Sequence, residues 1–178
     1  MNSIENQIYN NSIKSGISCL VTNWKNEILM VFEKHSNNRK LGGQLSLIFG
    51  NIEEGESPKQ ASIREVKEES GFDLHDVDFV SLKQVKFLSS LYNLYMFKST
   101  TSNLTCGNFI QYDTKGYKFL SLYELLNLGP HEIRPGTLEV IISTLFTSDY
   151  SNINIAINGS KYDKFKFLSL RNMLRRII

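Results

Sequence analysis

Apolar and polar residues alternate along the first part of the chain with the period of two that β-strands show. The alternation over 16–22 predicts one strand, Trp24-Lys25-Asn26 predicts a turn, and residues 27–32 predict a second strand. The short segment over 45–49, which is mostly apolar, predicts another strand. Further strands are expected over 77–87, 91–97 and 109–112.

One segment interrupts the strand pattern and carries helix signals at both ends. Ser57 suits the N-cap, and Gln60 stands three positions later, where it can complete a capping box. Pro58 suits the first helical position, and Gly71 suits the left-handed position just past the end. These signals predict a helix over 58–70.

The C-terminal part shows one more strand pattern and one more helix pattern. Residues 152–158 alternate asparagine with apolar residues, and Asn158-Gly159 is a strong turn dipeptide. Residues 165–178 predict a basic amphipathic helix. This helix could pack on the sheet with its basic face in water, form a dimer contact, or meet an acidic partner. The sequence leaves these alternatives open.

Length and charge restrict the class of protein. A chain of 178 residues with 41% hydrophobic residues is expected to form one domain over 1–178, with a C-terminal extension at about 151–178. The formal net charge of +2 does not indicate a general nucleic-acid surface. No apolar run resembles a signal peptide or spans a bilayer, so we expect a cytoplasmic protein that does not insert in a membrane.

Cysteines and histidines show no metal-ligand spacing. Cys19 and Cys106 are far apart and form no CxxC motif, so buried or inactive thiols are expected. His35, His75 and His131 are also isolated, and each is expected to be structural unless it contacts substrate.

The candidate chemistry lies in the predicted helix. Glu65, Glu68 and Glu69 are spaced three and four positions apart, so they share one helix face, where like charges repel. They also lie near the C-terminal end, where the helix dipole disfavours anions. A divalent cation would reverse both penalties, and carboxylate oxygens suit Mg²⁺. The alternative is an ordinary solvated face.

The spacing around these glutamates carries a resemblance. The run follows the pattern Gly-x5-Glu-x7-Arg-Glu-hydrophobic-x-Glu-Glu-x-Gly-hydrophobic, with these positions: Gly50, Glu56, Arg64, Glu65, Val66, Glu68, Glu69, Gly71 and Phe72. It resembles the Nudix box. The resemblance implies a Nudix-type α/β/α sandwich with a mixed β-sheet. It also implies a pyrophosphohydrolase that cleaves a nucleoside diphosphate linked to another group by attack of water.

The resemblance implies roles for the box residues. Glu68 and Glu69 are expected to be metal ligands, with the Gly50 carbonyl as a third. Glu65 is expected to be a ligand or the general base that activates water, and Arg64 to orient a box glutamate. Glu56, the box glutamate in the loop, is expected to reach the metal cluster or its waters. Mg²⁺ is the implied cofactor, with Mn²⁺ as a substitute.

The second half of the chain resembles later family segments. Residues 117–126 resemble an aromatic strand that runs into a short helix, and Pro135 is expected to open a helix over 136–146. Family members often add one more acid from the loop before the aromatic strand. Asp113 is the expected metal ligand there, with an ordinary turn residue as the alternative. Glu124 is the rival, but a structural role at the helix start is favoured.

Departures from the family pattern bear on the substrate. Many members have Pro-Gly-Gly where this chain has Ile48-Phe49-Gly50. The proline typical of members that act on ADP-ribose is absent, as is the tyrosine typical of members that act on dinucleoside polyphosphates. A (deoxy)nucleoside triphosphate or a related small triphosphate is favoured by elimination. Four aromatic side chains could stack on a base, although core packing is favoured for each: Trp24, Phe32, Phe49 and Tyr92.

The expected partner is a small molecule with a nucleoside diphosphate linkage. Nucleic acid is not expected, although capped RNA stays open as a substrate, and so does a homodimer. The alternative function is a catalytically weak Nudix-fold module that binds a nucleotide or regulates another protein.

Overall fold

The computed structural model describes residues 14–33, 42–74, 79–86, 92–100, 114–145 and 162–176. It contains a seven-stranded sheet and four helices within these residues. The strands are β1 Lys14–Thr22, β2 Ile28–Glu33, β3 Leu45–Ser46, β4 Ile48–Asn51, β5 Phe79–Lys86, β6 Tyr92–Thr100 and β7 Thr114–Leu120. The helices are α2 Pro58–Ser70, α3 Leu122–Asn127, α4 Thr137–Leu145 and α5 Lys164–Leu174.

Strand β1 organises the sheet. It pairs in parallel with β6 over its whole length and antiparallel with β4, with Ile17 opposite Gly50. It joins β2 through a hairpin that closes at Thr22 and Ile28. The order is β3-β2-β1-β6-β5, while β4 pairs with β1 and β7 pairs with β2. The sheet is therefore mixed, as expected.

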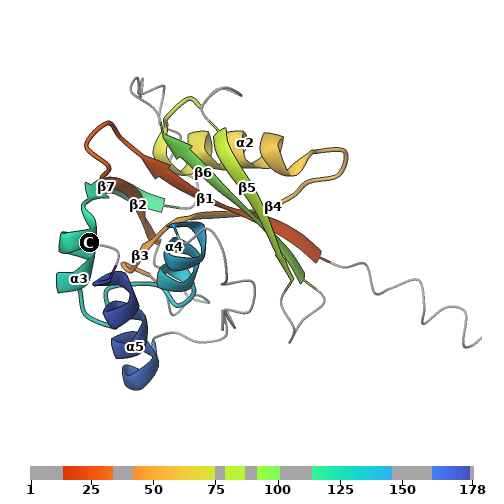
Figure 1. Ribbon diagram of the computed structural model, residues 1–178. Helices are drawn as coiled ribbons and strands as arrows, with labels where there is room; N and C mark the ends of the chain where they lie inside the picture. The colour runs from red at the N-terminus through yellow and green to blue at the C-terminus, as the bar shows by residue number, and fades with distance from the viewer. Residues whose placement is uncertain are drawn as a thin grey trace, which may run out of the picture.

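Helices cover both faces of the sheet, as Figure 1 shows, with α2 on one face and α3, α4 and α5 on the other. Alternate residues of β1 divide between two apolar clusters. Ile17 and Val21 pack with Ala61 and Val66 of α2, whereas Leu20 joins the cluster beneath α4 and α5. Both faces need apolar side chains because both are covered. The predicted α/β/α sandwich is confirmed.

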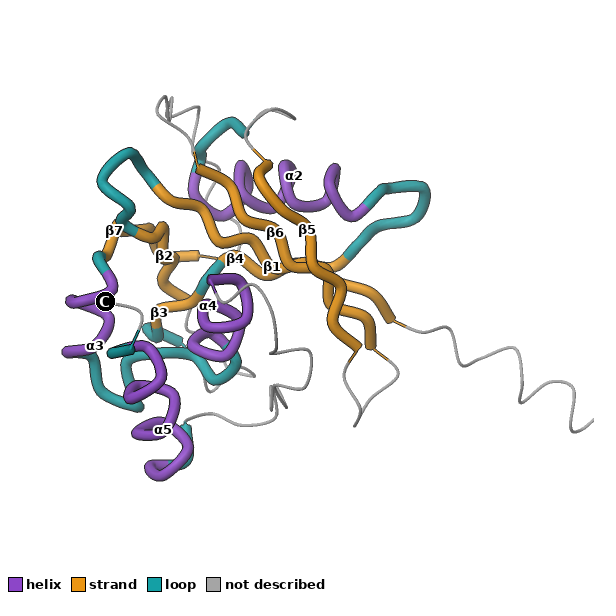
Figure 2. Tube along the Cα trace, in the orientation of Figure 1, coloured by secondary structure: helices purple, strands orange, loops and turns teal. Residues whose placement is uncertain are grey.

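The predicted strand over 45–49 is wrong in one respect. The structure divides it into β3, which pairs with β2, and β4, which pairs with β1, and Leu47 lies between them. The two short strands have different partners, so the chain passes from one partner strand to the other at Leu47, where the sequence shows no turn signal. Figure 2 shows the loop that then leads from β4 to α2.

The other predicted elements agree with the structure where it describes them, with ends displaced by a few residues. The C-terminal helix begins at Lys164, because the Asp163 side chain accepts hydrogen bonds from the N–H groups of Phe165 and Lys166. The predicted strands over 109–112 and 152–158 lie outside the described residues. Among the helices that are described, none is long and apolar enough to cross a membrane.

Candidate metal-binding and active site

Helix α2 forms as its capping residues predict. The Ser57 hydroxyl accepts a hydrogen bond from the Gln60 N–H at 3.3 Å, and the Gln60 side chain accepts one from the Ser57 N–H at 2.9 Å. Pro58 begins the helix. Gly71 ends it in the left-handed conformation (φ 76°), and its N–H donates to the Lys67 carbonyl. These local bonds fix where the helix starts and stops, and therefore which way its glutamates point.

Arg64 joins the loop to the helix. Its Nε and Nη2 atoms donate to the two carboxylate oxygens of Glu56, each at 3.0 Å, and Nη2 also donates to the Asn51 carbonyl at 2.9 Å. Its Nη1 atom donates to Glu65 at 2.9 Å and to Glu68 at 3.2 Å. One guanidinium thus links the end of β4 and one loop residue to two helix residues, and its bonds to the three carboxylates are charge-assisted.

This pairing accounts for the clustering of acids. Hydrogen bonds from Arg64 lower the pKa of Glu56 below its ordinary value, against an opposing effect of burial. The same contacts, with Glu56 first and Glu65 next, raise the pKa of the Arg64 guanidinium. The cation offsets part of the repulsion between glutamates on this helix face. The Glu68 side chain keeps 42% of its surface exposed, so it can turn toward an ion.

Gly50 and Glu65 are in close contact across the strand–helix junction. A Cβ atom on residue 50 would lie 2.1 Å from Cδ of Glu65, a separation that side chains do not tolerate. The present position of the Glu65 carboxylate therefore depends on a glycine at residue 50. Pairing of β4 with β1 holds Gly50 on the strand side, and helix α2 holds Glu65 on the other.

The oxygen donors suit a hard divalent cation. Glu65, Glu68 and Glu69 supply carboxylates, Gly50 supplies a nearby main chain, and Glu69 Oε2 is shielded from solvent. Such oxygen sets are what Mg²⁺ and Mn²⁺ prefer. Within the described part of the chain, no three acidic, histidine or cysteine side chains already converge on one ion position. Instead Arg64 Nη1 engages one carboxylate oxygen of Glu65 and one of Glu68.

The remaining predicted site residues lie elsewhere. Glu56 reaches Arg64, and its contact with the metal stays a prediction. Asp113 lies outside the described residues. Glu124 caps α3: its carboxylate accepts from the Ser121 N–H at 2.8 Å, and its own N–H donates to the Ser121 hydroxyl. The structural role expected for Glu124 agrees with this geometry.

The candidate side chains outside the box differ in how deeply they are buried. Cys19 is fully buried in β1, and burial raises the pKa of its thiol to about 12, as an inactive thiol requires. Phe32 and Phe49 are partly buried against the core. The expectation that Trp24 packs in the core is wrong, because 70% of its surface is exposed at the β1–β2 turn.

One group beside the box was missed by sequence reasoning. The Arg134 guanidinium lies over the Phe49 ring, 5.1 Å from its centre, and forms an ion pair with the buried Glu33. Glu33 and Arg134 are 101 positions apart, and no local signal joins them. The sequence marks Phe49 as a departure before Gly50 but does not indicate its contact with Arg134.

Comparison with known proteins identifies the family. A sequence model of the NUDIX domain matches residues 13–141, which is more than half of the chain. The chain belongs to the NUDIX domain family. It is a hydrolase of the class that acts on pyrophosphate bonds. The Nudix box at 50–72 lies inside the matched region, and α5 lies beyond it. A search of curated proteins found no match.

Solved Nudix structures share the fold at low sequence identity. The NUDIX hydrolase from Nitrosomonas europaea is 19% identical with a TM-score of 0.56, over 72% of this chain and 85% of that one. The NUDIX domain of Shewanella oneidensis NrtR, complexed with ADP ribose, is 13% identical with a TM-score of 0.54, over 72% and 89%.

A third structure is a larger protein. The bifunctional NMN adenylyltransferase/ADP ribose pyrophosphatase from Francisella tularensis, complexed with AMP and a manganese ion, is 22% identical with a TM-score of 0.51. The alignment covers 67% of this chain and 38% of that one. At these identities the likeness establishes the fold alone.

Proposed function

We propose that this protein is a Mg²⁺-dependent Nudix pyrophosphohydrolase that cleaves a nucleoside diphosphate linkage by attack of water, and that Mn²⁺ can replace Mg²⁺. The observation that carries the proposal is the contact between Gly50 and the Glu65 carboxylate, beside Glu68 and Glu69 on the same helix. This contact between β4 and α2 supports a metal site at the junction of the two elements.

Each box residue has a part in the proposal. Glu68, Glu69 and the Gly50 carbonyl hold the ion, which lowers the pKa of bound water and offsets the charge of the diphosphate. Glu65 is a further ligand or accepts the proton of the attacking water, since its carboxylate lies against Gly50. Arg64 positions Glu65 and Glu68 by donating to both.

The loop acids contribute less directly. Both oxygens of Glu56 accept from Arg64, so Glu56 is proposed to hold the arginine in place and to meet the metal cluster only through water. Asp113 is kept as a candidate ligand on the resemblance alone. We also propose that residues 1–178 form one domain, which the shared apolar cluster of α5 and the sheet supports.

The favoured substrate is a (deoxy)nucleoside triphosphate or a related small triphosphate, because the family markers for other substrates are missing. ADP-ribose is the second candidate. Structures that resemble this one include a domain complexed with ADP ribose and a protein with ADP ribose pyrophosphatase in its name. Capped RNA stays open, and so does a homodimer.

The test begins with a screen for phosphate or pyrophosphate release from nucleoside triphosphates, nucleotide sugars, dinucleotides and capped RNA with Mg²⁺ at mildly alkaline pH. On the best substrate, Glu68→Gln and Glu69→Gln should each lower turnover by roughly 10²-fold or more. Circular dichroism should show the fold unchanged. Glu54→Gln, an exposed loop glutamate, is the matched control and should keep full activity.

Two results would overturn parts of the proposal. Full activity in both Glu68→Gln and Glu69→Gln would remove the metal assignment. No turnover by the unaltered protein with either Mg²⁺ or Mn²⁺, together with tight nucleotide binding, would favour the alternative: a nucleotide-binding or regulatory module on the same fold.

A further inference from the structure

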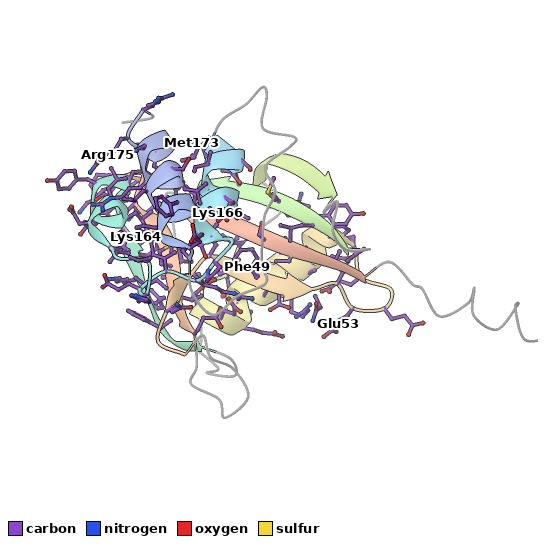
Figure 3. All side chains as sticks on the ribbon, turned by 90° about the horizontal axis from the view of Figure 1, so that it is seen from below. Phe49, Glu53, Lys164, Lys166, Met173 and Arg175 are labelled. Carbon is purple, nitrogen blue, oxygen red and sulfur yellow. The ribbon has the colours of Figure 1, made fainter. Side chains whose placement is uncertain are left out.

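The residue before Gly50 points to the opposite side of the sheet. Ile48 packs in the cluster beneath α2, and Gly50 faces Glu65 of the same helix. Phe49 lies between them, so its ring points the other way and packs against the cluster that includes α4 and α5. Figure 3 shows Phe49 on the face where α5 lies. One short strand thus connects the candidate metal site to a second set of side chains.

Side chains of that second set contact the Phe49 ring on two sides. The ring lies between the apolar core and the guanidinium of Arg134, whose Cζ atom is 5.1 Å from the ring centre. Arg134 donates to Glu33, a side chain that is only 10% exposed at the end of β2. A guanidinium over an aromatic face attracts it, and more strongly when water is partly excluded.

The main chain of Arg134 is also held. Its N–H donates to the Leu45 carbonyl at 2.9 Å, and the Leu45 N–H donates to the Glu132 carbonyl at 2.7 Å. The segment therefore runs beside β3 and cannot follow Phe49 if that ring moves. Arg134 is a fixed support, attached to β2 by its side chain and to β3 by its backbone.

We propose that Phe49 is a positioning residue for the Gly50 carbonyl in the metal site, and that Arg134 and Glu33 hold it in place. This inference rests on the proposed function. Mg²⁺ requires nearly ideal octahedral geometry with ligand distances of about 2.0–2.1 Å, so a small shift of one ligand weakens binding. The Glu65 carboxylate fills the space on the other side of Gly50, so support from Phe49 fixes the strand between two layers.

The proposal explains a departure from the family pattern. Many Nudix boxes have a second glycine where this chain has Phe49, and a glycine cannot be held by a side chain. Here the Phe49 ring holds β4 from the side of the sheet opposite Glu65. Residues that orient a metal ligand without touching the metal typically change metal affinity by about 10–100-fold when they are altered.

The test measures metal binding without substrate. Mn²⁺ is titrated into the full-length protein and its free fraction is followed by electron paramagnetic resonance. Phe49→Leu and Arg134→Gln should each weaken Mn²⁺ binding by roughly tenfold. In the hydrolysis assay the Mg²⁺ concentration for half-maximal activity should rise by a similar factor, while KM for the substrate at saturating Mg²⁺ stays unchanged. Phe49→Tyr keeps the ring and should bind Mn²⁺ as tightly as the unaltered protein does.

The chain offers a matched control. Phe32 is also partly buried against the same cluster, and Lys118 lies over its ring, 5.7 Å from the centre, but Phe32 is on β2 and not next to Gly50. Phe32→Leu should lower stability about as much as Phe49→Leu and leave Mn²⁺ binding unchanged. If Phe49→Leu does not fold, Arg134→Gln, which leaves the ring in place, decides the question.

The outcomes separate the two proposals. If the unaltered protein binds Mn²⁺ and cleaves substrate but Phe49→Leu and Arg134→Gln bind Mn²⁺ normally, the positioning role is wrong and the proposed function stands. If the unaltered protein binds no Mn²⁺ and cleaves none of the screened compounds, the proposed function fails and this inference fails with it.

Discussion

At the scale of single residues, the candidate site depends on how closely Glu65 approaches Gly50. The Glu65 carboxylate fills the space that a Cβ atom at position 50 would occupy. Because a glutamate side chain is flexible, adding that atom would displace the carboxylate before it disturbed the sheet. The residue is therefore more important for the site than for the fold.

Gly50→Ala should separate these effects. We expect at least a tenfold loss of kcat/KM, which corresponds to about 1.4 kcal/mol, with only a small change in the free energy of unfolding. Gly129→Ala is the control, because its added Cβ would lie 3.3 Å from Glu132 Oε2, a much milder contact outside the box. Equal activity in the two variants would show that the close contact at Gly50 has no part in catalysis.

At the scale of elements, Arg64 couples the loop after β4 to helix α2. The helix is specified locally by its caps, whereas the hydrogen bonds within the loop 52–56 join Glu53 to Glu56. Four acceptors meet one guanidinium: Asn51, Glu56, Glu65 and Glu68. Since Glu56 receives two of these bonds, it is the main anchor of the arginine.

This coupling should depend on pH in a defined direction. Hydrogen bonds from Arg64 lower the pKa of folded Glu56 below its ordinary value of 4.5. The pairing of Glu56 with Arg64 therefore stabilises the folded protein above pH 4.5, and this stabilisation is lost as the pH falls through the lowered pKa of Glu56. Glu56→Gln should be less stable than the unaltered protein in urea unfolding at pH 7, and the difference should shrink at about pH 3. A difference that grows on acidification would contradict this account.

At the scale of the whole molecule, a buried polar group attaches α5 to the domain. The Tyr162 hydroxyl donates to Glu139 at 2.6 Å and accepts from the Leu138 N–H at 3.0 Å, and Lys166 pairs with Glu139 at 2.8 Å. Glu139 is fully buried in α4. Burial first, and the nearby Glu139 charge next, raise the pKa of Tyr162, so its hydroxyl stays protonated as a donor.

Tyr162→Phe tests whether the C-terminal helix belongs to the same cooperative unit. Removing the hydroxyl takes one hydrogen-bond partner from the Leu138 N–H and one from the Glu139 carboxylate, both of which are buried. This loss should lower the free energy of unfolding by about 1–3 kcal/mol. The single urea transition should move as a whole. Tyr123→Phe, at a side chain that is 69% exposed, should have no effect. A main transition that does not move in Tyr162→Phe would place 162–176 outside the domain.

The sequence predicted what depends on neighbours in the chain. The caps at Ser57 and Gly71 gave the limits of α2, because their hydrogen bonds lie within a few residues. The division of 45–49 into two strands could not be predicted, since it depends on which strand each half meets. The same holds for Phe49 under Arg134 and for Tyr162 against Glu139, which come together only when distant elements pack.

The most direct measurement of the central claim is to follow an oxygen isotope through the reaction. The substrate panel is incubated with the protein and Mg²⁺ in ¹⁸O-water, and the products are analysed by mass spectrometry. We predict that at least one diphosphate-linked compound is cleaved into two phosphate-bearing products, one of which carries a single ¹⁸O atom, and that Glu69→Gln abolishes this labelling. Absence of cleavage across the panel with Mg²⁺ and with Mn²⁺, or products without the label, would contradict hydrolysis at this site.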